Sequence, residues 1–366
     1  MKQTCLYEKH VALGALMQPF GGFIMPIQYT SIIEEHNAVR NACGVFDVSH
    51  MGEVLVSGVD AERFVNHIFT NDVAGMPLGK ILYGMMCYEN GGVVDDLLVY
   101  KRADHCFLLV INAANIDKDL QWIEEQAQKG FNVIITDQCD YYGELAVQGP
   151  ESERVMEEVL ELPCSELSFY TFKEIANYKG TNETIIVSRT GYTGEDGFEV
   201  YGTHAFIQEM WDKLIASGRC LPCGLGCRDT LRFEVGLPLY GDELSEDITP
   251  IMAGLGIFVK LDKAEFIGKE ALLKQKTEGV ARKLVGIELR DKAIPRHGYT
   301  VLFEGQEVGE VTTGYNSIST GKSVCMALID AEHAKLGTPL EVQIRKKTFP
   351  GVVVKKRFYE KHYKKD

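Results

Sequence analysis

Hydrophobic and polar residues alternate in short segments along the chain, and the clearest pattern surrounds Asn90-Gly91-Gly92. Apolar runs at 81–87 and 93–100 flank this tripeptide, and Asn-Gly is a strong signal for a tight turn. The stretch is therefore predicted to form a β-hairpin. From residue 54 to residue 135, strand-like and helical segments alternate around it. That order predicts an α+β sandwich of the ferredoxin-like type rather than a doubly wound sheet.

The remaining pattern predicts a further α+β region and a C-terminal region rich in strands. Short strands with glycine-containing turns beyond residue 280 are typical of a small β-barrel or sandwich, so the last boundary is placed there. Residues 19–26, rich in Phe and Gly, are expected to form an irregular loop. Helices are expected at 31–42, 61–69, 116–128, 151–160, 204–216, from 224 and within 263–279, and strands at 106–111, 133–135, 174–176, 183–188, 284–289, 300–302, 307–312, 324–328, 340–344 and 351–355.

Two adjacent carboxylates, Asp95 and Asp96, lie in the second strand of the predicted hairpin. Neighbouring side chains of a strand point to opposite faces, so the two acids are not expected to act as one dyad. Both faces are otherwise apolar, so at least one carboxylate should enter a dry region, where an unpaired charge is costly. A structural partner and a chemical task both remain open. Asp95 is expected to share a face with Val93, Leu97 and Val99, and Asp96 with Val94, Leu98 and Tyr100.

Composition and charge narrow the class of protein. The chain has 366 residues, 45% of them hydrophobic and 25% charged, with a formal net charge of −14. These values are typical of a soluble globular protein of two or three domains, and the acidic balance argues against partners such as nucleic acid or an anionic membrane. No apolar run approaches the roughly 18 residues of a membrane span. The N-terminal residues lack a signal or transit pattern and the ten scattered cysteines are expected to be reduced, so the predicted location is the bacterial cytoplasm.

The C-terminal segment is basic although the whole chain is acidic. Residues 345–366 hold nine Lys or Arg and two Asp or Glu, a formal charge of +7, so the rest of the chain carries −21. A solvated tail and a site for an anionic ligand or partner are both compatible with this distribution.

Two further stretches contain side chains that could carry chemistry. Cys220, Cys223 and Cys227 have no fourth Cys or His nearby in sequence, so packing at a helix start is favoured over a metal site. The glycine-rich turn 191–197 holds Glu195 where a phosphate loop would need Lys or Ser/Thr. A carboxylate in a rigid turn can accept two N–H bonds from a ligand edge, but a purely structural turn remains open.

Arg228 and Arg232 lie one turn apart on the same face of a predicted helix. Either they pair with internal acids such as Asp229 and Glu234, or one of them reaches a ligand. His50 is expected to be a hydrogen-bonded loop residue, because the histidines form no metal-ligand or catalytic spacing.

Taken together, these motifs resemble one family, the aminomethyltransferases, or T-proteins, of the glycine cleavage system. Each motif is weak alone, but the set occurs in the order of the family across nearly the whole chain. The matching stretches are Pro19-Phe20-Gly21-Gly22-Phe23-x-Met25-Pro26-x-Gln28-Tyr29, Phe46-Asp47-Val48-Ser49-His50-Met51-Gly52, Gly91-Gly92-Val93-Val94-Asp95-Asp96-Leu97, Val110-Ile111-Asn112-Ala113-Ala114-Asn115, Gly191-Tyr192-Thr193-Gly194-Glu195-Asp196-Gly197-Phe198-Glu199, Arg228-Asp229-Thr230-Leu231-Arg232 and Val259-Lys260-Leu261-Asp262-Lys263-x-x-Phe266-Ile267-Gly268-Lys269.

The resemblance implies a three-domain cloverleaf arranged around a central tetrahydrofolate site. Its first domain, which binds folate, would be residues 1–52 with 137–262. The ferredoxin-like insertion, residues 53–136, would carry Asp96, and residues 280–366 would form a C-terminal β-barrel. The implied reaction takes an aminomethyl group from the lipoyl-lysine arm of a partner, H-protein. The products are ammonia, 5,10-methylenetetrahydrofolate and the dihydrolipoyl arm, with tetrahydrofolate as co-substrate and no metal.

The resemblance also implies roles for individual residues. Asp96 matches the catalytic aspartate of the family, whose negative charge would stabilise cationic species and relay a proton. Glu195 matches the pterin-binding glutamate, and Arg228 matches a folate-contacting arginine. The C-terminal segment departs from the usual Pro-Phe start of the family. The positions that line the folate pocket match Tyr83, Met51, Asn112 and Tyr363.

Two relatives of the same fold offer other interpretations. One is the C-terminal module of a dimethylglycine- or sarcosine-oxidising enzyme, but the Gly-x-Gly-x-x-Gly fingerprint of a preceding flavin domain does not occur here. The other is a non-enzymatic, folate-binding iron–sulfur assembly factor. That relative carries a Lys-Gly-Cys-Tyr-like motif where this chain has Phe266-Ile267-Gly268-Lys269-Glu270, so aminomethyltransferase is the favoured interpretation.

Overall fold

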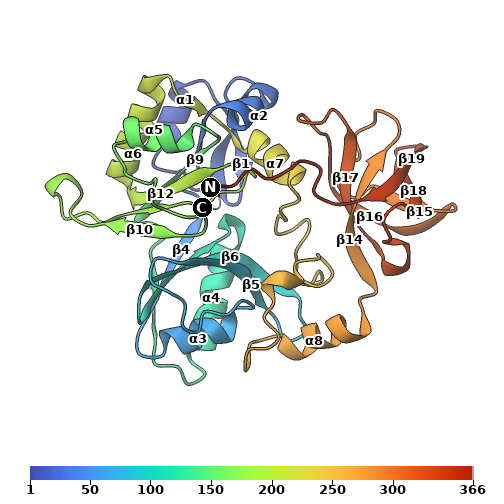
Figure 1. Ribbon diagram of the computed structural model, residues 1–366, viewed down its shortest axis with the longest axis horizontal. Helices are drawn as coiled ribbons and strands as arrows, with labels where there is room; N and C mark the ends of the chain where they lie inside the picture. Colours follow the sequence, from blue (N-terminus) through green and yellow to red (C-terminus); the bar gives the residue numbers. More distant parts are fainter. Residues whose placement is uncertain (365–366) are drawn as a thin grey trace.

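The computed structural model describes residues 1–364, whose elements form three lobes (Figure 1). Two lobes contain open sheets with helices, and the third is a closed barrel. The predicted α+β class and the predicted C-terminal barrel are therefore confirmed. Within residues 1–364, no helix combines the length and the apolar character needed to cross a membrane.

The first lobe contains a six-stranded sheet of order β10-β11-β12-β9-β3-β13. Its strands are β3 (Gly44–Asp47), β9 (Tyr142–Gln148), β10 (Phe172–Ile175), β11 (Ile185–Ser188), β12 (Gly197–Thr203) and β13 (Leu221–Pro222). Its helices are α1 (Tyr7–Ala12), α2 (Ile32–Asn41), α5 (Ser152–Glu158), α6 (His204–Ser217) and α7 (Leu225–Glu234), with the 3₁₀ turn η2 (Tyr178–Gly180). Gly218, in the left-handed conformation with φ of 65°, ends α6, which extends one residue beyond the helix predicted at 204–216.

The predicted irregular loop at 19–26 is wrong, because β1 (Leu16–Phe20) and β2 (Phe23–Gln28) form an antiparallel hairpin. Gly21 and Gly22 have φ of 54° and 85°, which allows a two-residue turn between the strands. Two prolines obscured the pattern, because proline lacks the N–H group that a strand needs. In this two-stranded sheet both strands are edge strands, where proline is tolerated.

The second lobe contains a five-stranded antiparallel sheet of order β5-β6-β7-β4-β8. Phe64 and Ile123, from its two helices, pack with the sheet in one core cluster. The opposite face of the sheet meets the first lobe, where Tyr100 packs against Tyr201. The elements are β4 (Gly52–Ser57), α3 (Ala61–Ile68), β5 (Ile81–Cys87), β6 (Val93–Ala103), β7 (Cys106–Ile111), η1 (Ala113–Asn115), α4 (Ile116–Ala127) and β8 (Ile134–Asp137).

The predicted hairpin is the antiparallel pair β5–β6, and its two acids face opposite ways as expected. Asp95 bonds to Asn115 at the start of α4, whereas Asp96 bonds to Tyr83 on β5. The pairing register shifts between Met86 and Cys87, which marks a β-bulge. The faces predicted for Val93 and Val94 are wrong because this bulge reverses the alternation. Val94 packs with Leu97 and Val99, and Val93 packs with Met85 and Cys87.

The third lobe is a closed barrel of order β14-β17-β16-β15-β18-β19. The segment before it is less helical than predicted, because α8 (Lys269–Glu278) begins only after Gly268. Phe266 and Leu272 of this segment pack in one cluster with Met85 of the second lobe and Leu284 of the barrel. The barrel strands are β14 (Arg282–Leu289), β15 (Thr300–Phe303), β16 (Gln306–Asn316), β17 (Ser323–Asp330), β18 (Pro339–Ile344) and β19 (Lys347–Val354), with the turns η3 (Gly256–Phe258) before them and η4 (Ala331–His333) among them.

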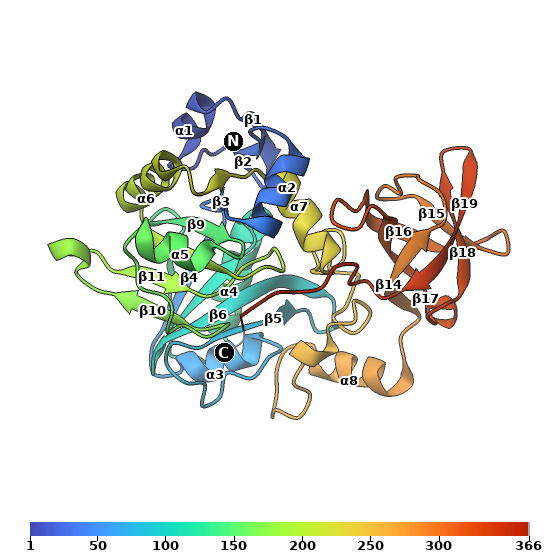
Figure 2. The same ribbon diagram turned by 45° about the horizontal axis from the view of Figure 1, so that its top comes forward.

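The C-terminal segment returns from the barrel to the other two lobes, as both views show (Figures 1 and 2). The backbone N–H of His362 donates to the carbonyl of Gly194 at 2.7 Å. This contact places the end of the chain on the glycine-rich turn of the first lobe.

Candidate active site

The carboxyl group of Asp96 lies on β6, on the face that meets the first lobe. The hydroxyl of Tyr83 donates to its Oδ2 at 2.9 Å, and Nδ2 of Asn112 donates to its Oδ1 at 3.0 Å. Burial, with the nearby charge of Asp95, raises the pKa of Asp96 to about 7. A carboxyl group with such a pKa can both accept and release a proton near neutral pH.

The neighbouring Asp95 is fully buried and accepts three N–H bonds. Its Oδ2 accepts from the backbone of Asn112 at 2.9 Å, and its Oδ1 accepts from Nδ2 of Asn112 at 2.8 Å and Nδ2 of Asn115 at 2.7 Å. Asn115 occupies the N-cap position of α4, but its side chain makes no capping bond there. The amide of Asn112 thus bonds to both acids of the hairpin.

Arg228, near the start of α7, has a buried N–H donor, Nη1, that makes no hydrogen bond within residues 1–364. Its guanidinium lies 4.9 Å from the ring centroid of Tyr192, a residue of the glycine-rich turn. Burial raises the pKa of Tyr192. The charge of Asp96 adds to this rise, whereas the charges of Arg232 and Arg228 oppose it. An unpaired buried guanidinium donor is costly unless a ligand or water completes it.

Arg232, one helical turn further along, is fully occupied by internal acids. It lies 2.7 Å from Asp229 and 2.7 Å from Glu243 in two ion pairs. Of the two alternatives that the sequence leaves open, internal pairing therefore applies to Arg232. Arg228 has the free donor that a ligand needs.

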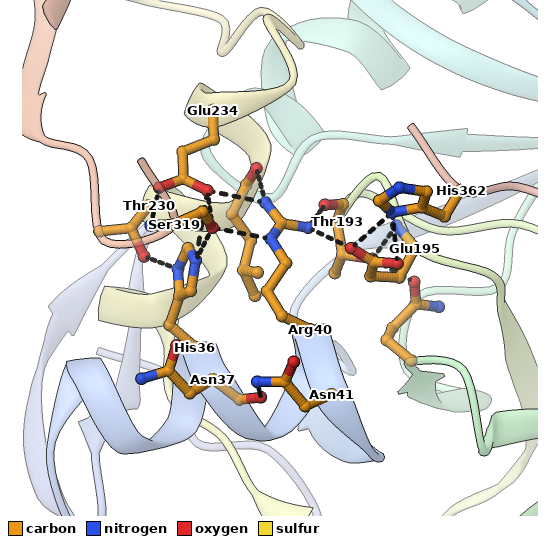
Figure 3. A network of polar contacts seen from close by, with 12 residues as sticks. His36, Asn37, Arg40, Asn41, Thr193, Glu195, Thr230, Glu234, Ser319 and His362 are labelled. Atoms are coloured by element: carbon orange, nitrogen blue, oxygen red, sulfur yellow. Dashed lines mark hydrogen bonds and ion pairs between the residues drawn. The ribbon is translucent and has the colours of Figure 1, made fainter. Parts of the chain in front are cut away.

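Glu195 is buried in the glycine-rich turn, with 3% of its surface exposed, and it is paired with Arg40 of α2 (Figure 3). Nη1 of Arg40 lies 3.0 Å from Oε1 of Glu195 and donates to the carbonyl of Thr193 at 2.7 Å. Nη2 of Arg40 lies 3.1 Å from Glu234, the last residue of α7. Arg40 therefore fixes the turn that carries Glu195 against two helices.

Glu234 connects this network to the barrel. Its Oε1 accepts from the hydroxyl of Ser317 at 2.7 Å and from the backbone of Ser319 at 2.9 Å. His36 lies 3.3 Å from its other oxygen (Figure 3). Although burial raises the pKa of Glu234, His36 and Ser319 lower it to about 2. The charged network therefore joins α2, α7 and the β16–β17 loop of the barrel.

The C-terminal segment completes the surroundings of Glu195. Nδ1 of His362 lies 3.2 Å from Oε2 of Glu195, and the ring of Tyr359 stacks on the guanidinium of Arg40 at 4.3 Å. Tyr363 stacks on Phe169 with the ring centroids 4.3 Å apart and the planes inclined by 19°. Tyr363 directly follows His362, so the stacked pair of Tyr363 and Phe169 lies next to the contact between His362 and Glu195.

Met51 and His50 lie in the turn between β3 and β4. Met51 packs against the clusters that contain Tyr100 and Cys227. His50 is not the hydrogen-bonded loop residue that was expected. It is buried, and its Nδ1 has no partner among the described residues. Burial lowers the pKa of His50 to about 4, so the ring is neutral at pH 7, where Arg228 also disfavours its charge.

Two of the clustered cysteines, Cys223 and Cys227, lie with Glu35 in a buried group whose ligand atoms are within 4.8 Å of one another. The carboxylate of Glu35 accepts backbone N–H bonds from Tyr29 at 2.6 Å and Gly224 at 2.8 Å. These bonds fix the β2–α2 loop to the start of α7, which agrees with a packing role at a helix start.

Sequence interpretation missed Arg40 and Tyr192 as neighbours of the candidate site residues. Arg40 follows His36 by four residues on a predicted helix, so both side chains point to one face. That spacing was the available signal, and it does not identify Glu195 as a partner. The structure brings Asp96, Tyr83 and Asn112 into direct contact, places Arg228 on the ring of Tyr192, and groups Glu195 with the C-terminal segment.

Comparisons with known proteins cover almost the whole chain. Residues 6–263 match the family model described as the GCVT N-terminal domain, and residues 282–360 match the glycine cleavage T-protein C-terminal barrel domain. The chain is 50% identical to an aminomethyltransferase of Caldanaerobacter subterraneus subsp. tengcongensis, covering 100% of this chain and 98% of that protein. It is also 50% identical to an aminomethyltransferase of Lysinibacillus sphaericus, over 99% and 98% of the two chains. The crystal structure of glycine cleavage system aminomethyltransferase T from Bartonella henselae is 32% identical, covers 100% of this chain and 99% of that one, and has a TM-score of 0.94.

Proposed function

Because the chain belongs to the T-protein family of the glycine cleavage system, it is an aminomethyltransferase, and we propose its substrates and the residues that act on them. The donor is the S-aminomethyldihydrolipoyl-lysine arm of H-protein, and the acceptor is tetrahydrofolate. Transfer of the methylene carbon releases ammonia and forms 5,10-methylenetetrahydrofolate. The products also include the dihydrolipoyl arm.

The observation that carries this proposal is the environment of Asp96. Its carboxyl group is held by Tyr83 and Asn112 and has a pKa raised to about 7 by burial and by Asp95. Bound tetrahydrofolate would supply the nucleophilic nitrogen. As an anion, Asp96 stabilises the positive charge that develops on the aminomethyl carbon, and it accepts the proton that the attacking nitrogen sheds. Asp96 can then return that proton to the departing ammonia.

Arg228 and Glu195 are the residues that we propose to bind the folate. The Nη1 atom of Arg228 is a buried donor without a partner among residues 1–364, which fits a polar ligand. Glu195 already contacts Arg40 and His362, but a carboxylate has about four lone-pair sites and can accept further N–H bonds. Two adjacent N–H groups of a pterin ring match that capacity. We propose that the pocket is lined by Tyr83, Met51, Asn112 and Tyr363.

The domains that we propose follow the three lobes. The strands of the six-stranded sheet come from both sides of residues 53–136, which supports a first domain made of 1–52 and 137–262. The five-stranded sheet lies within the proposed insertion, apart from Gly52 at the start of β4 and Asp137 at the end of β8, and the barrel lies within 280–366. The ten free thiols support the proposed location in the bacterial cytoplasm.

The surface that we propose to receive H-protein is basic. A hollow of about 480 Å³ lies between the barrel and the C-terminal segment. Its apolar base includes Leu284 and Val353, and no Asp or Glu lines it. An acidic partner is the complement of such a surface. The basic residues around it are Lys283, Lys355, Lys356, Arg357 and Lys361.

The proposed function is tested by ammonia release from aminomethylated H-protein in the presence of tetrahydrofolate. We expect turnover with both substrates and a large loss of rate when tetrahydrofolate is omitted. Formation of 5,10-methylenetetrahydrofolate should equal the ammonia released. Binding of tetrahydrofolate without turnover would contradict the proposal and assign the chain a role in folate binding alone.

A further inference from the structure

A second buried acid, Asp119, lies behind the hairpin on the first turn of α4. Its side chain is fully buried. Nζ of Lys118 donates to its Oδ1 at 2.7 Å, and to the carbonyl of Val94. Its Oδ2 is buried and has no partner among residues 1–364. A fully buried carboxyl oxygen without a partner requires a proton or a neighbour to make its burial tolerable.

Asp95 is the neighbouring acid. Asn115, which donates to Oδ1 of Asp95 at 2.7 Å, lies one helical turn before Asp119, and the ammonium of Lys118 bonds both to Asp119 and to the carbonyl of Val94, the residue before Asp95. The two carboxyl groups differ in their bonds. Asp95 accepts three N–H bonds from Asn112 and Asn115, which favour its charged form. Two close carboxyl groups in a dry region cannot both ionise. Burial, followed by the charge of Asp95, raises the pKa of Asp119 to about 10. Asp119 therefore keeps the proton and Asp95 keeps the negative charge.

Asn112 transmits this charge to the site. Its Nδ2 atom lies 2.8 Å from Oδ1 of Asp95 and 3.0 Å from Oδ1 of Asp96, so one amide group separates the two acids. A like charge at that separation disfavours ionisation of the second acid. The charge on Asp95 therefore acts on Asp96 although the side chains lie on opposite faces of β6.

We propose that Asp95 and Asp119 form a buried pair that holds one proton and one negative charge, and that this charge determines at which pH Asp96 can accept the reaction proton. The proposal rests on the proposed function, because it concerns Asp96 as the proton acceptor. Asp95 and Asp119 are positioning residues, because they act on Asp96 through the amide of Asn112 and not on the substrate. Asp95 and Asp119 take no other part in the proposed reaction.

The other titratable groups around these acids are few. Lys118, on α4, lies 5.2 Å from the ring centroid of Tyr240, and Tyr240 is close to both Asp95 and Asp119. Tyr88 and Glu246 also raise the pKa of Tyr240. On the pocket side, Asp96 faces Tyr83 from β5 and Tyr170 and Tyr192 from the first lobe.

The test is the pH dependence of kcat for ammonia release at saturating substrates in three variants. In Asp119→Asn the pair keeps one negative charge on Asp95, so the acid limb of the profile should stay where it is in the unmodified protein. In Asp95→Asn the charge on Asp95 is lost and Asp119 can ionise beside Lys118, further from Asp96. The limb should then move to lower pH. The double variant carries no charge in the pair and should move the limb furthest, by about one to three pH units.

Asp117→Asn is the matched control, because Asp117 is an exposed carboxylate in the same turn of α4. It should not move the limb. A limb that moves equally in Asp119→Asn and Asp95→Asn would overturn the proposal. So would a limb that stays fixed in Asp95→Asn and the double variant while their melting temperatures fall. Failure of the unmodified protein to release ammonia would instead contradict the proposed function.

A second measurement does not depend on the folding of the Asp95 variant. Infrared difference spectra of the unmodified protein and Asp119→Asn at pH 7.5 should show loss of one protonated carboxylic acid band. The near-isosteric amide should preserve the fold, which circular dichroism checks. Identical carboxylic acid bands in the two proteins would show that Asp119 is ionised and would overturn the assignment of the proton.

Discussion

Asp96 and Glu195 are both carboxyl groups close to the meeting of the lobes, but their neighbours differ in charge. Glu195 lies between the guanidinium of Arg40 and the ring of His362. Asp96 bonds to a phenol and an amide, has Asp95 beside it, and forms no ion pair with Lys, Arg or His in the part of the chain described. The ion pair with Arg40 therefore fixes the direction of Glu195, whereas the raised pKa of Asp96 favours the exchange of a proton.

This difference supports the proposed division of the two acids between folate binding and chemistry. A carboxylate with fixed cationic partners keeps its charge and its direction, which suits recognition of N–H groups. A carboxyl group near a like charge keeps a pKa close to the working pH, which suits acid–base catalysis.

The largest effect is expected on stability when Arg40 is replaced by Met. Arg40→Met leaves Glu195 and Glu234 buried without their shared cation, which should cost about 3–5 kcal/mol of unfolding free energy. Urea titration measures this loss. Arg154→Met, which removes an exposed partner of Glu151, should cost about 0–1 kcal/mol. Equal losses in the two variants would contradict a central structural role for Arg40.

Asp96→Asn should lower kcat by about 10²-fold or more, because the amide keeps the shape but cannot carry charge or accept the proton. Tetrahydrofolate should still bind. The measurement is kcat for ammonia release together with folate affinity by calorimetry. A variant with unchanged kcat would remove Asp96 from the chemistry.

Glu195→Gln should weaken tetrahydrofolate binding by about 1.5–3 kcal/mol, because an acceptor facing ring N–H groups becomes a donor. Calorimetry measures the affinity, and the melting temperature checks that the turn still folds. Glu158→Gln, at an exposed carboxylate paired with Arg219, is the control and should not change the affinity. Unchanged folate affinity in a folded Glu195→Gln variant would assign Glu195 to the turn alone.

Asp96 should also give the stability of the protein a pH dependence. Its pKa in the fold, about 7, is above the ordinary value of 3.8, so its favourable contribution is present below pH 4 and is lost as the pH rises through 7. In Asp96→Asn the side chain cannot ionise, so the variant does not lose this stability as the pH rises. The melting temperature of the variant relative to the unmodified protein should therefore rise between pH 5 and pH 8, by the equivalent of about 2–3 kcal/mol. A constant difference across that range would mean that the pKa of Asp96 is not raised.

Salt should have the smallest effect, and it should act on the partner rather than on the chemistry. Charges at an exposed basic surface are screened with a Debye length of about 8 Å at 0.15 M salt. Raising the salt concentration should raise KM for H-protein severalfold and leave kcat nearly unchanged. A KM that does not respond to salt would contradict docking through the basic C-terminal surface.

The parts of the fold that the sequence predicted correctly depend on local patterns. The Asn90-Gly91 turn with its flanking apolar runs is enough to define a hairpin, and glycine-punctuated strands are enough to suggest the barrel. The errors arise where the local rule is broken. The bulge at Val94 reverses the faces of Val93 and Val94, and the prolines of β1 and β2 hide a hairpin that has only edge strands.

The surroundings of the candidate site depend on contacts between distant residues, which local patterns do not contain. Arg40 meets Glu195 across 155 positions of the sequence, and His362 meets it across 167. Asp119, in contrast, follows Asn115 by one helical turn and could have been placed behind the hairpin from helix geometry alone. The protonation of Asp119 could not have been predicted from the sequence, because its pKa depends on burial and on the charge of Asp95.

The most direct test of the different roles of Asp96 and Glu195 is the single-turnover rate of ammonia release as tetrahydrofolate is raised to saturation. We expect Glu195→Gln to approach the rate of the unmodified protein at high folate, because only binding is impaired. Asp96→Asn should remain about 10²-fold slower or more at every folate concentration, because the proton acceptor is missing. If saturating folate restores Asp96→Asn, or fails to restore Glu195→Gln, then binding and proton transfer are not divided between these two acids.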